Sequence, residues 1–151
     1  MKEFSSTEEI LDFAIGEEQS AADFYTHLAS QVNNPSVRKM FMEFSEEELQ
    51  HKSKLENIKM GSVEYLPTSD VVNLGLEEVL VDVMPTDDLD YQDALILAMK
   101  KEKAAYQMYT RLASVASEPE IKQLLMGLAN QEANHKLRFE IEYDEHVLTE
   151  D

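Results

Sequence analysis

The sequence predicts an all-α protein, an antiparallel four-helix bundle built of two similar helical hairpins that are joined by a long crossover. Apolar residues recur at steps of three and four over four long stretches, which is the period of an amphipathic helix. The second half of the chain repeats the first at an offset of 84 residues, which relates Tyr25 to Tyr109 and Pro35 to Pro119. The stretch between the repeats contains prolines, a glycine and polar clusters instead. We therefore expect one domain over residues 1–151.

The first hairpin is expected to have helices over residues 7–33 and 36–60. Hydroxyl residues followed by two glutamates at residues 5–9 are typical of a helix start, because a hydroxyl caps the first amides and acid favours the positive end of a helix. Asn34 and Pro35 mark the turn between the two helices, since proline suits a first helical turn. Gly61 ends the hairpin.

The crossover is expected over residues 61–89. Its apolar piece, residues 76–84, fits either a short helix or an extended segment against the bundle. A connection of this length suits two helices that do not run antiparallel as neighbours. The second hairpin is expected to have helices over residues 90–116 and 119–144, followed by a polar tail that frays.

Charge and composition exclude several classes of function. The chain has 13 basic and 31 acidic residues and a net charge of −18, which argues against nucleic acid and anionic membranes as partners, because both are polyanions. The sequence has no secretory leader and no long apolar run, so we expect a soluble, cytoplasmic protein. Cysteine is absent, which excludes disulfides, thiol catalysis and thiolate-ligated iron sites within this chain.

Two Glu-x-x-His motifs, one in each repeat, are the strongest functional signal. Each places a carboxylate and an imidazole three residues apart, and therefore on one face of a helix. Each is preceded, one helix earlier, by a further glutamate within an apolar stripe. Glu plus Glu-x-x-His, present twice, is the ligand pattern of a dinuclear metal site in a four-helix bundle. The six candidate metal ligands are Glu18, Glu48, His51, Glu102, Glu132 and His135.

Charge balance favours a metal over a structural role for these glutamates. A single glutamate on an apolar stripe is most simply an edge residue whose carboxylate reaches water. Four of them, one per helix at corresponding heights, would bury four charges without compensation, which is costly. Two divalent cations balance the four carboxylates, and the mixed oxygen and nitrogen ligands suit iron or manganese. We expect two iron ions, with manganese or mixed occupancy as the alternative.

Neighbouring acids are set aside where the other repeat has no acid at the corresponding position. This applies to Glu17, Glu46 and Glu47, and a displacement of one residue from a ligand also turns a side chain about 100° away from the stripe. His27 and His146 likewise have no histidine as counterpart and are not expected to be ligands.

Three tyrosines are candidates for a second layer around the site. Tyr106 lies one turn beyond Glu102, while Tyr25 and Tyr109 lie two turns beyond the glutamate of their own helix. A hydrogen bond to a ligand carboxylate, or a redox-active phenol, is one interpretation, and aromatic packing in the core is the other. The two interpretations are equally favoured for Tyr106, whereas core packing is favoured for Tyr25 and Tyr109.

With these motifs, the sequence resembles the ferritin-like di-iron carboxylate proteins, in particular the rubrerythrin-like branch, over about residues 7–143. The runs Ala-Ile-x-x-Glu-x-x-Ala at residues 14–21 and Ala-Met-x-x-Glu-x-x-Ala at residues 98–105 belong to this pattern. The resemblance implies a ferritin-like fold and a role for each ligand. One metal would be served by Glu18 and His51, the other by Glu102 and His135, and the two would be bridged by Glu48 and Glu132.

Rubrerythrins reduce hydrogen peroxide at such a site, and ferritins oxidise ferrous iron for storage. Rubrerythrins also carry a rubredoxin domain, for which this chain has neither the length nor the cysteines, and place a further glutamate where this sequence has Ala105. The resemblance therefore implies a form without a rubredoxin domain. This would be an oxidoreductase that reduces hydrogen peroxide or O2 with electrons from an external donor such as a rubredoxin-like protein.

Two other functions stay open from the sequence. One is an iron-binding or ferroxidase module for storage or detoxification, and the other is a bundle whose metal site is purely structural. The apolar part of the crossover also fits an interface between subunits, so we expect a homodimer.

Overall fold

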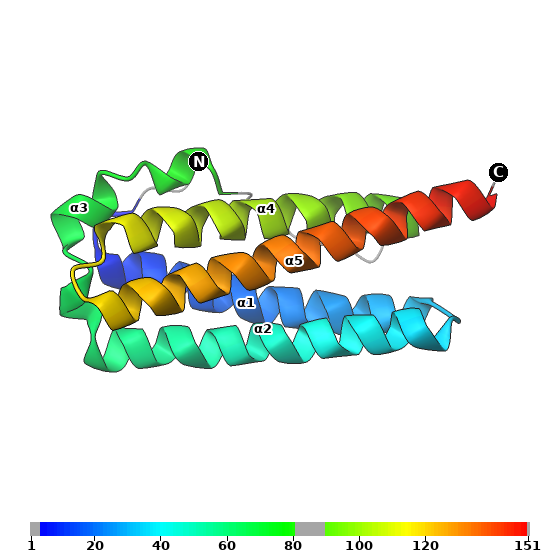
Figure 1. The fold of residues 1–151 in the computed structure, drawn as a ribbon, viewed down its shortest axis with the longest axis horizontal. Coiled ribbons are helices and arrows are strands. Elements are labelled where there is room, and N and C mark those ends of the chain that lie inside the picture. The colour runs from blue at the N-terminus through cyan, green and yellow to red at the C-terminus, as the bar shows by residue number, and fades with distance from the viewer. Residues whose placement is uncertain (1–3, 81–89, 151) are drawn as a thin grey trace.

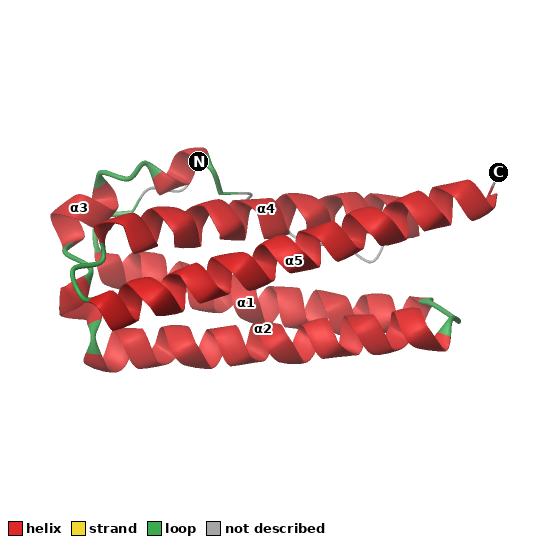
Figure 2. Cartoon of the chain, in the orientation of Figure 1, coloured by secondary structure: helices red, strands yellow, loops and turns green. Residues whose placement is uncertain are grey.

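The computed structural model describes residues 4–80 and 90–150, which form a bundle of long helices (Figure 1). Helix α1 packs against α2 and α4 packs against α5, so that two hairpins lie side by side. The described residues contain helices, turns and loops and no strand (Figure 2). The predicted all-α bundle is confirmed. The long helices are α1 (Thr7–Gln31), α2 (Pro35–Gly61), α4 (Tyr91–Val115) and α5 (Pro119–Glu150).

Each long helix begins where a side chain satisfies its first amides. Ser6, Asn34 and Asp90 precede α1, α2 and α4 and accept backbone N–H groups at 3.1, 2.9 and 2.8 Å. Glu118 does the same for α5, at 3.1 Å. Such caps fix a helix start because the first four amides have no partner within the helix.

The ends of the hairpins explain the long crossover. Because the turn between α1 and α2 lies at one end of the bundle and the turn between α4 and α5 at the other, α2 and α4 run in the same direction (Figure 1). The end of α2 and the start of α4 therefore lie at opposite ends of the bundle (Figure 1). Helix α5 continues to Glu150, beyond the end at residue 144 that the sequence predicts.

The described part of the crossover is a series of short helical turns. These are η1 (Val63–Tyr65), α3 (Thr68–Val72) and η2 (Leu76–Glu78). Gly75, which precedes η2, has φ +65°, a left-handed conformation that favours glycine. The apolar piece expected over residues 76–84 thus begins as a 3₁₀ helix, and residues 81–84 lie outside the described residues.

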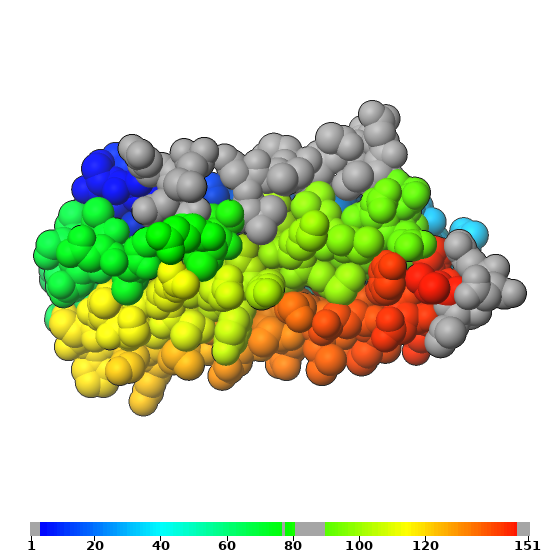
Figure 3. Space-filling model, turned by 90° about the horizontal axis from the view of Figure 1, so that it is seen from above, coloured from blue at the N-terminus to red at the C-terminus, as the bar shows by residue number. Residues whose placement is uncertain are grey.

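This segment covers one end of the second hairpin, where green and yellow surfaces adjoin in Figure 3. Leu66, Val71 and Leu76 are buried in the cluster that α4 and α5 help to form. The Ser117 amide donates to the Tyr65 carbonyl at 2.9 Å. Val71 and Leu76 therefore bury their side chains within the chain, and the homodimer stays a prediction.

The apolar core is divided into two clusters along the bundle. One contains Leu11, Leu55 and Leu112, and the other contains Leu28 and Phe41. The residues between them along each helix are the glutamates and histidines singled out above. No helix within the described ranges is both long and apolar enough to cross a membrane.

Candidate metal centre

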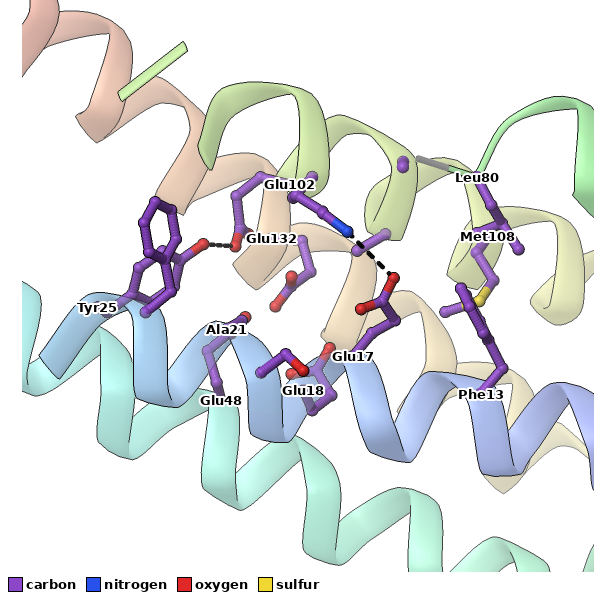
Figure 4. Close-up of a pocket in the computed structure, with 15 residues that line it drawn as sticks. Phe13, Glu17, Glu18, Ala21, Tyr25, Glu48, Leu80, Glu102, Met108 and Glu132 are labelled. Atoms are coloured by element: carbon purple, nitrogen blue, oxygen red, sulfur yellow. Dashed lines mark hydrogen bonds and ion pairs between the residues drawn. The ribbon is translucent and has the colours of Figure 1, made fainter. Parts of the chain in front are cut away.

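The middle of the bundle holds a cluster of buried carboxylates and imidazoles. Each long helix contributes, and the four glutamates point toward one another between the helices (Figure 4). None of the six side chains is more than 3% exposed. The structure thus brings together all six candidate ligands, namely Glu18, Glu48, His51, Glu102, Glu132 and His135.

The six residues form two overlapping groups of four that could each hold a metal ion. Within each group, one potential ligand atom per residue lies within 4.8 Å of the others. Glu48 and Glu132 belong to both groups. The groups are Glu18, Glu48, His51 and Glu132, and Glu48, Glu102, Glu132 and His135.

The donor atoms in this cluster are buried without hydrogen bonds. Among the described residues, seven buried side-chain atoms lack a hydrogen-bond partner, and six of them belong to the cluster, one per residue. They are Glu18 Oε2, Glu48 Oε1, His51 Nδ1, Glu102 Oε2, Glu132 Oε1 and His135 Nδ1. Buried polar atoms are rarely left unpaired. A carboxylate oxygen from every helix and two imidazole nitrogens, all aimed at one place, fit a pair of metal ions.

The carboxylates interact unfavourably with one another when no cation lies between them. Burial raises the pKa of Glu48 well above its ordinary value, and the charges of Glu102 and Glu18 raise it further. The pKa of Glu132 is raised in the same way, first by burial and then by Glu102 and Glu18. Burial also raises the pKa of Glu18, although the neighbouring His51 imidazole opposes this rise.

The imidazoles partly offset this negative charge. The Nδ1 atom of His51 lies 2.8 Å from Glu132 and 3.3 Å from both Glu18 and Glu48. Burial alone would lower the pKa of His51, but the contacts with Glu132 and Glu18 outweigh it and raise the pKa to about 10. The pKa of His135 is also raised, since Glu102 and Glu47 together outweigh burial.

Two tyrosines hold carboxylates of the opposite hairpin. The Tyr109 hydroxyl donates to Glu18 at 2.7 Å, and the Tyr25 hydroxyl donates to Glu102. Burial raises the pKa of both phenols well above 10, which keeps them protonated as donors. The preference for simple core packing at these two positions is therefore wrong, because each ring packs in the core and also binds a carboxylate.

Tyr106, the third candidate, is 39% exposed. None of the described hydrogen bonds joins it to a carboxylate of the cluster. Four residues after Glu102, its side chain is turned by about 40° around the helix toward solvent, whereas Tyr109, seven residues after Glu102, is turned by only about 20° in the other sense and is buried.

The outer nitrogens of the imidazoles contact two residues that sequence reasoning sets aside or overlooks. His135 Nε2 lies 2.6 Å from Glu47 Oε2, and His51 Nε2 contacts Gln131 Oε1. Glu47 and Gln131 correspond at the offset of 84, and each directly precedes the glutamate of a Glu-x-x-His motif. That shared position is the signal that could have identified them, since both side chains accept hydrogen bonds although only one is acidic.

A cavity of about 50 Å³ lies against the cluster, between α1 and α4. This is several times the ~10–15 Å³ that one water molecule needs. All four glutamates of the cluster line it, together with apolar side chains that include Phe13, Ala21 and Met108 (Figure 4). Ala105 also lines it. An ion pair between Lys101 and Glu17, at 3.3 Å, also borders the cavity.

Comparison with known proteins supports this description. A family model described as Rubrerythrin matches residues 9–143. An inferred ferritin-like diiron-carboxylate protein from Thermotoga maritima matches the fold with a TM-score of 0.76 and 18% identity, covering 97% of this chain and 99% of that one. A hypothetical protein from Pyrococcus furiosus matches with a TM-score of 0.71 and 27% identity, covering 92% and 89%. A search of curated proteins gives no match. The predicted ferritin-like fold is thus confirmed.

Proposed function

Because the chain belongs to the rubrerythrin family, we propose that it is a non-haem di-iron protein that reduces hydrogen peroxide or O2 with electrons from an external donor. The observation that carries this proposal is the set of six buried donor atoms without hydrogen bonds, next to a small cavity. The similar fold of an inferred diiron-carboxylate protein supports iron as the metal.

The proposed ligand set has the charge and geometry that two divalent cations require. Four carboxylates against two divalent ions leave no net charge, and neutral imidazoles complete the two sets of ligands. Membership of Glu48 and Glu132 in both groups supports their role as bridges. One ion would then be held by Glu18 and His51 and the other by Glu102 and His135, with manganese as the alternative metal.

Two ferrous ions held in this way would together supply the two electrons that, with two protons, convert hydrogen peroxide into two water molecules. The protein's own part is to hold the ligands in place. Tyr25 and Tyr109 each fix a carboxylate across the gap between hairpins, so a ligand of one hairpin is oriented by the other. The proposal assigns the supply of electrons for repeated turnover to an external donor.

The cavity supports a small, uncharged oxidant as the substrate. Its lining beyond the glutamates is largely apolar, which disfavours a hydrated cation or an anionic metabolite but accepts hydrogen peroxide or O2. Ala105 lines this cavity at the position where the family resemblance places a further glutamate. The small side chain therefore keeps the approach to the carboxylates open.

The proposal is tested by loading metal-free protein with ferrous iron under anaerobic conditions and mixing it with oxidant. We expect about two iron ions per chain and faster oxidation by hydrogen peroxide than by O2, followed in stopped-flow absorbance of the ferric product. Without a donor, oxidation should stop after one turnover with both irons retained. Faster oxidation by O2, with release of ferric iron and continued ferrous uptake, would instead support a ferroxidase.

Filling the cavity should slow the reaction without removing the metal. Ala105→Phe places a bulky ring between α1 and α4, so we expect oxidation by hydrogen peroxide to slow by about tenfold or more, which is ~1.4 kcal/mol in the barrier. Iron content, measured in the same samples, should stay near that of the unaltered protein. Ala105→Ser, which changes the volume little, is the control. An unchanged rate in Ala105→Phe would show that oxidant reaches the site elsewhere.

A further inference from the structure

The two halves of the cluster place corresponding carboxylates beside each imidazole but differ in the residue at its outer nitrogen. His135 Nε2 faces the carboxylate of Glu47 at 2.6 Å, whereas His51 Nε2 faces the amide oxygen of Gln131. The Glu47 side chain is 39% exposed, so solvent stabilises its negative charge. The internal repeat thus places a charged acceptor on one imidazole and a neutral acceptor on the other.

The two imidazoles also differ in the side chain that packs on the face of the ring. The ring of Phe44 stacks on His135 with a centroid distance of 4.0 Å and an interplanar angle of 27°. The corresponding position in the other repeat is Leu128, which has no ring to stack. His135 is therefore held by a carboxylate at its outer nitrogen and by an aromatic ring on its face.

The contacts also fix which nitrogen can bind a metal. A carboxylate oxygen and an amide carbonyl oxygen both accept hydrogen bonds, so each Nε2 carries a proton and donates. The Nδ1 atoms, which lack hydrogen bonds, are then the nitrogens that face the glutamates. An imidazole whose N–H donates to a carboxylate is a stronger base at its other nitrogen than one whose N–H donates to a neutral group.

We propose, building on the di-iron function above, that Glu47 and Gln131 are positioning residues that make the two metal positions unequal. The position served by His135 binds its divalent cation first and more tightly, and the position served by His51 binds second. Two features distinguish the positions, the charge of the outer partner and the ring stacked on His135, while the remaining ligands correspond in type.

Cobalt(II) is a suitable probe, because it is not oxidised during a titration and its spectrum reports binding. In the full-length protein freed of metal by a chelator, we expect two binding steps whose dissociation constants differ by about 10–100-fold, the usual effect of a residue behind a metal ligand. Glu47→Gln should weaken the first step and bring the two together. Gln131→Glu should lower the dissociation constant of the second step, which also brings the two dissociation constants closer together.

The order of filling is read from the imidazole N–H protons, whose NMR signals are strongly shifted by bound cobalt(II). At one equivalent of metal, we expect one shifted N–H signal in the unaltered protein. That signal moves in Glu47→Gln and keeps its position in Gln131→Glu, and in both variants a second signal joins it because the two affinities are then similar. In the double variant Glu47→Gln/Gln131→Glu, the charged partner lies on His51, so the first signal should become that of His51. This reversal would not follow from a merely structural role of Glu47.

The outcomes separate this inference from the function on which it rests. Failure of the unaltered protein to bind two cobalt ions would overturn the di-metal proposal itself. Binding of two ions with steps and N–H signals that neither substitution changes would overturn only the inequality. Far-UV circular dichroism of each variant confirms that the bundle is folded, and both exchanges between Glu and Gln conserve side-chain size.

Discussion

Replacing Glu48 by Gln is expected to abolish binding of the metal pair and, in the metal-free protein, to increase stability. Glu48 belongs to both ligand groups, so its loss removes a donor from each metal position. Without metal, four carboxylates face two imidazoles, and even two protonated imidazoles leave negative charge uncompensated in the core. We expect the free energy of unfolding of the metal-free protein to rise by about 1–4 kcal/mol at neutral or alkaline pH.

Urea unfolding with a chelator measures the stability, and metal analysis after ferrous loading measures the binding. Glu132→Gln should behave in the same way, because Glu132 is the other shared ligand. Glu56→Gln is the matched control, since Glu56 lies on the same helix as Glu48 but is exposed. Tight binding of two metals by either cluster variant would remove its assignment as a bridge.

The stability of the metal-free protein is expected to fall as the pH rises, whereas its affinity for metal should increase. Glu18, Glu48 and Glu132 have pKa values raised above 4.5 in the folded protein, so the stability that their protons give is complete below pH 4.5 and lost as the pH rises through the raised values. The pKa of His51 is raised from 6.5 to about 10, so its contribution is complete below pH 6.5 and lost toward pH 10. The glutamates and His51 therefore both make the metal-free protein less stable as the pH rises.

The expected slope is about 1.4 kcal/mol per pH unit for each additional proton held by the folded state. Metal binding has the opposite dependence, because a cation must displace protons from the carboxylates and from the Nδ1 atoms. Urea unfolding from about pH 5 to about pH 10, with chelator and with saturating metal, would show both trends. In Glu48→Gln the metal-free slope should be smaller. Stability of the metal-free protein that increased toward alkaline pH would contradict this account.

The six cluster residues could be predicted because the sequence repeats itself. A single glutamate among 31 acidic residues has no distinguishing feature, but Glu18 and Glu102 occupy equivalent places on equivalent stripes. The same rule explains what was missed. Glu47 was set aside because its counterpart, Gln131, is not an acid, although both accept a hydrogen bond from an imidazole.

Contacts between the hairpins were harder to predict than contacts within them. Tyr25 binds Glu102, and Tyr109 binds Glu18, so each partner lies on the opposite hairpin. Helical periodicity describes the direction of a side chain on its own helix and contains no information about the rotation of the neighbouring hairpin. Periodicity does not predict the described part of the crossover for the same reason, since its short turns follow the surface onto which they pack.

The division of the core into two apolar clusters means that folding and reactivity depend on different layers of the same helices. The ends of the bundle bury the leucines and aromatic rings that stabilise it, while the middle layer contains charges that oppose folding until a cation binds. The two apolar ends, by contrast, pack the four helices against one another on either side of this layer. The apolar ends therefore supply the stability of the bundle, and the central layer can hold charged metal ligands although they lower that stability.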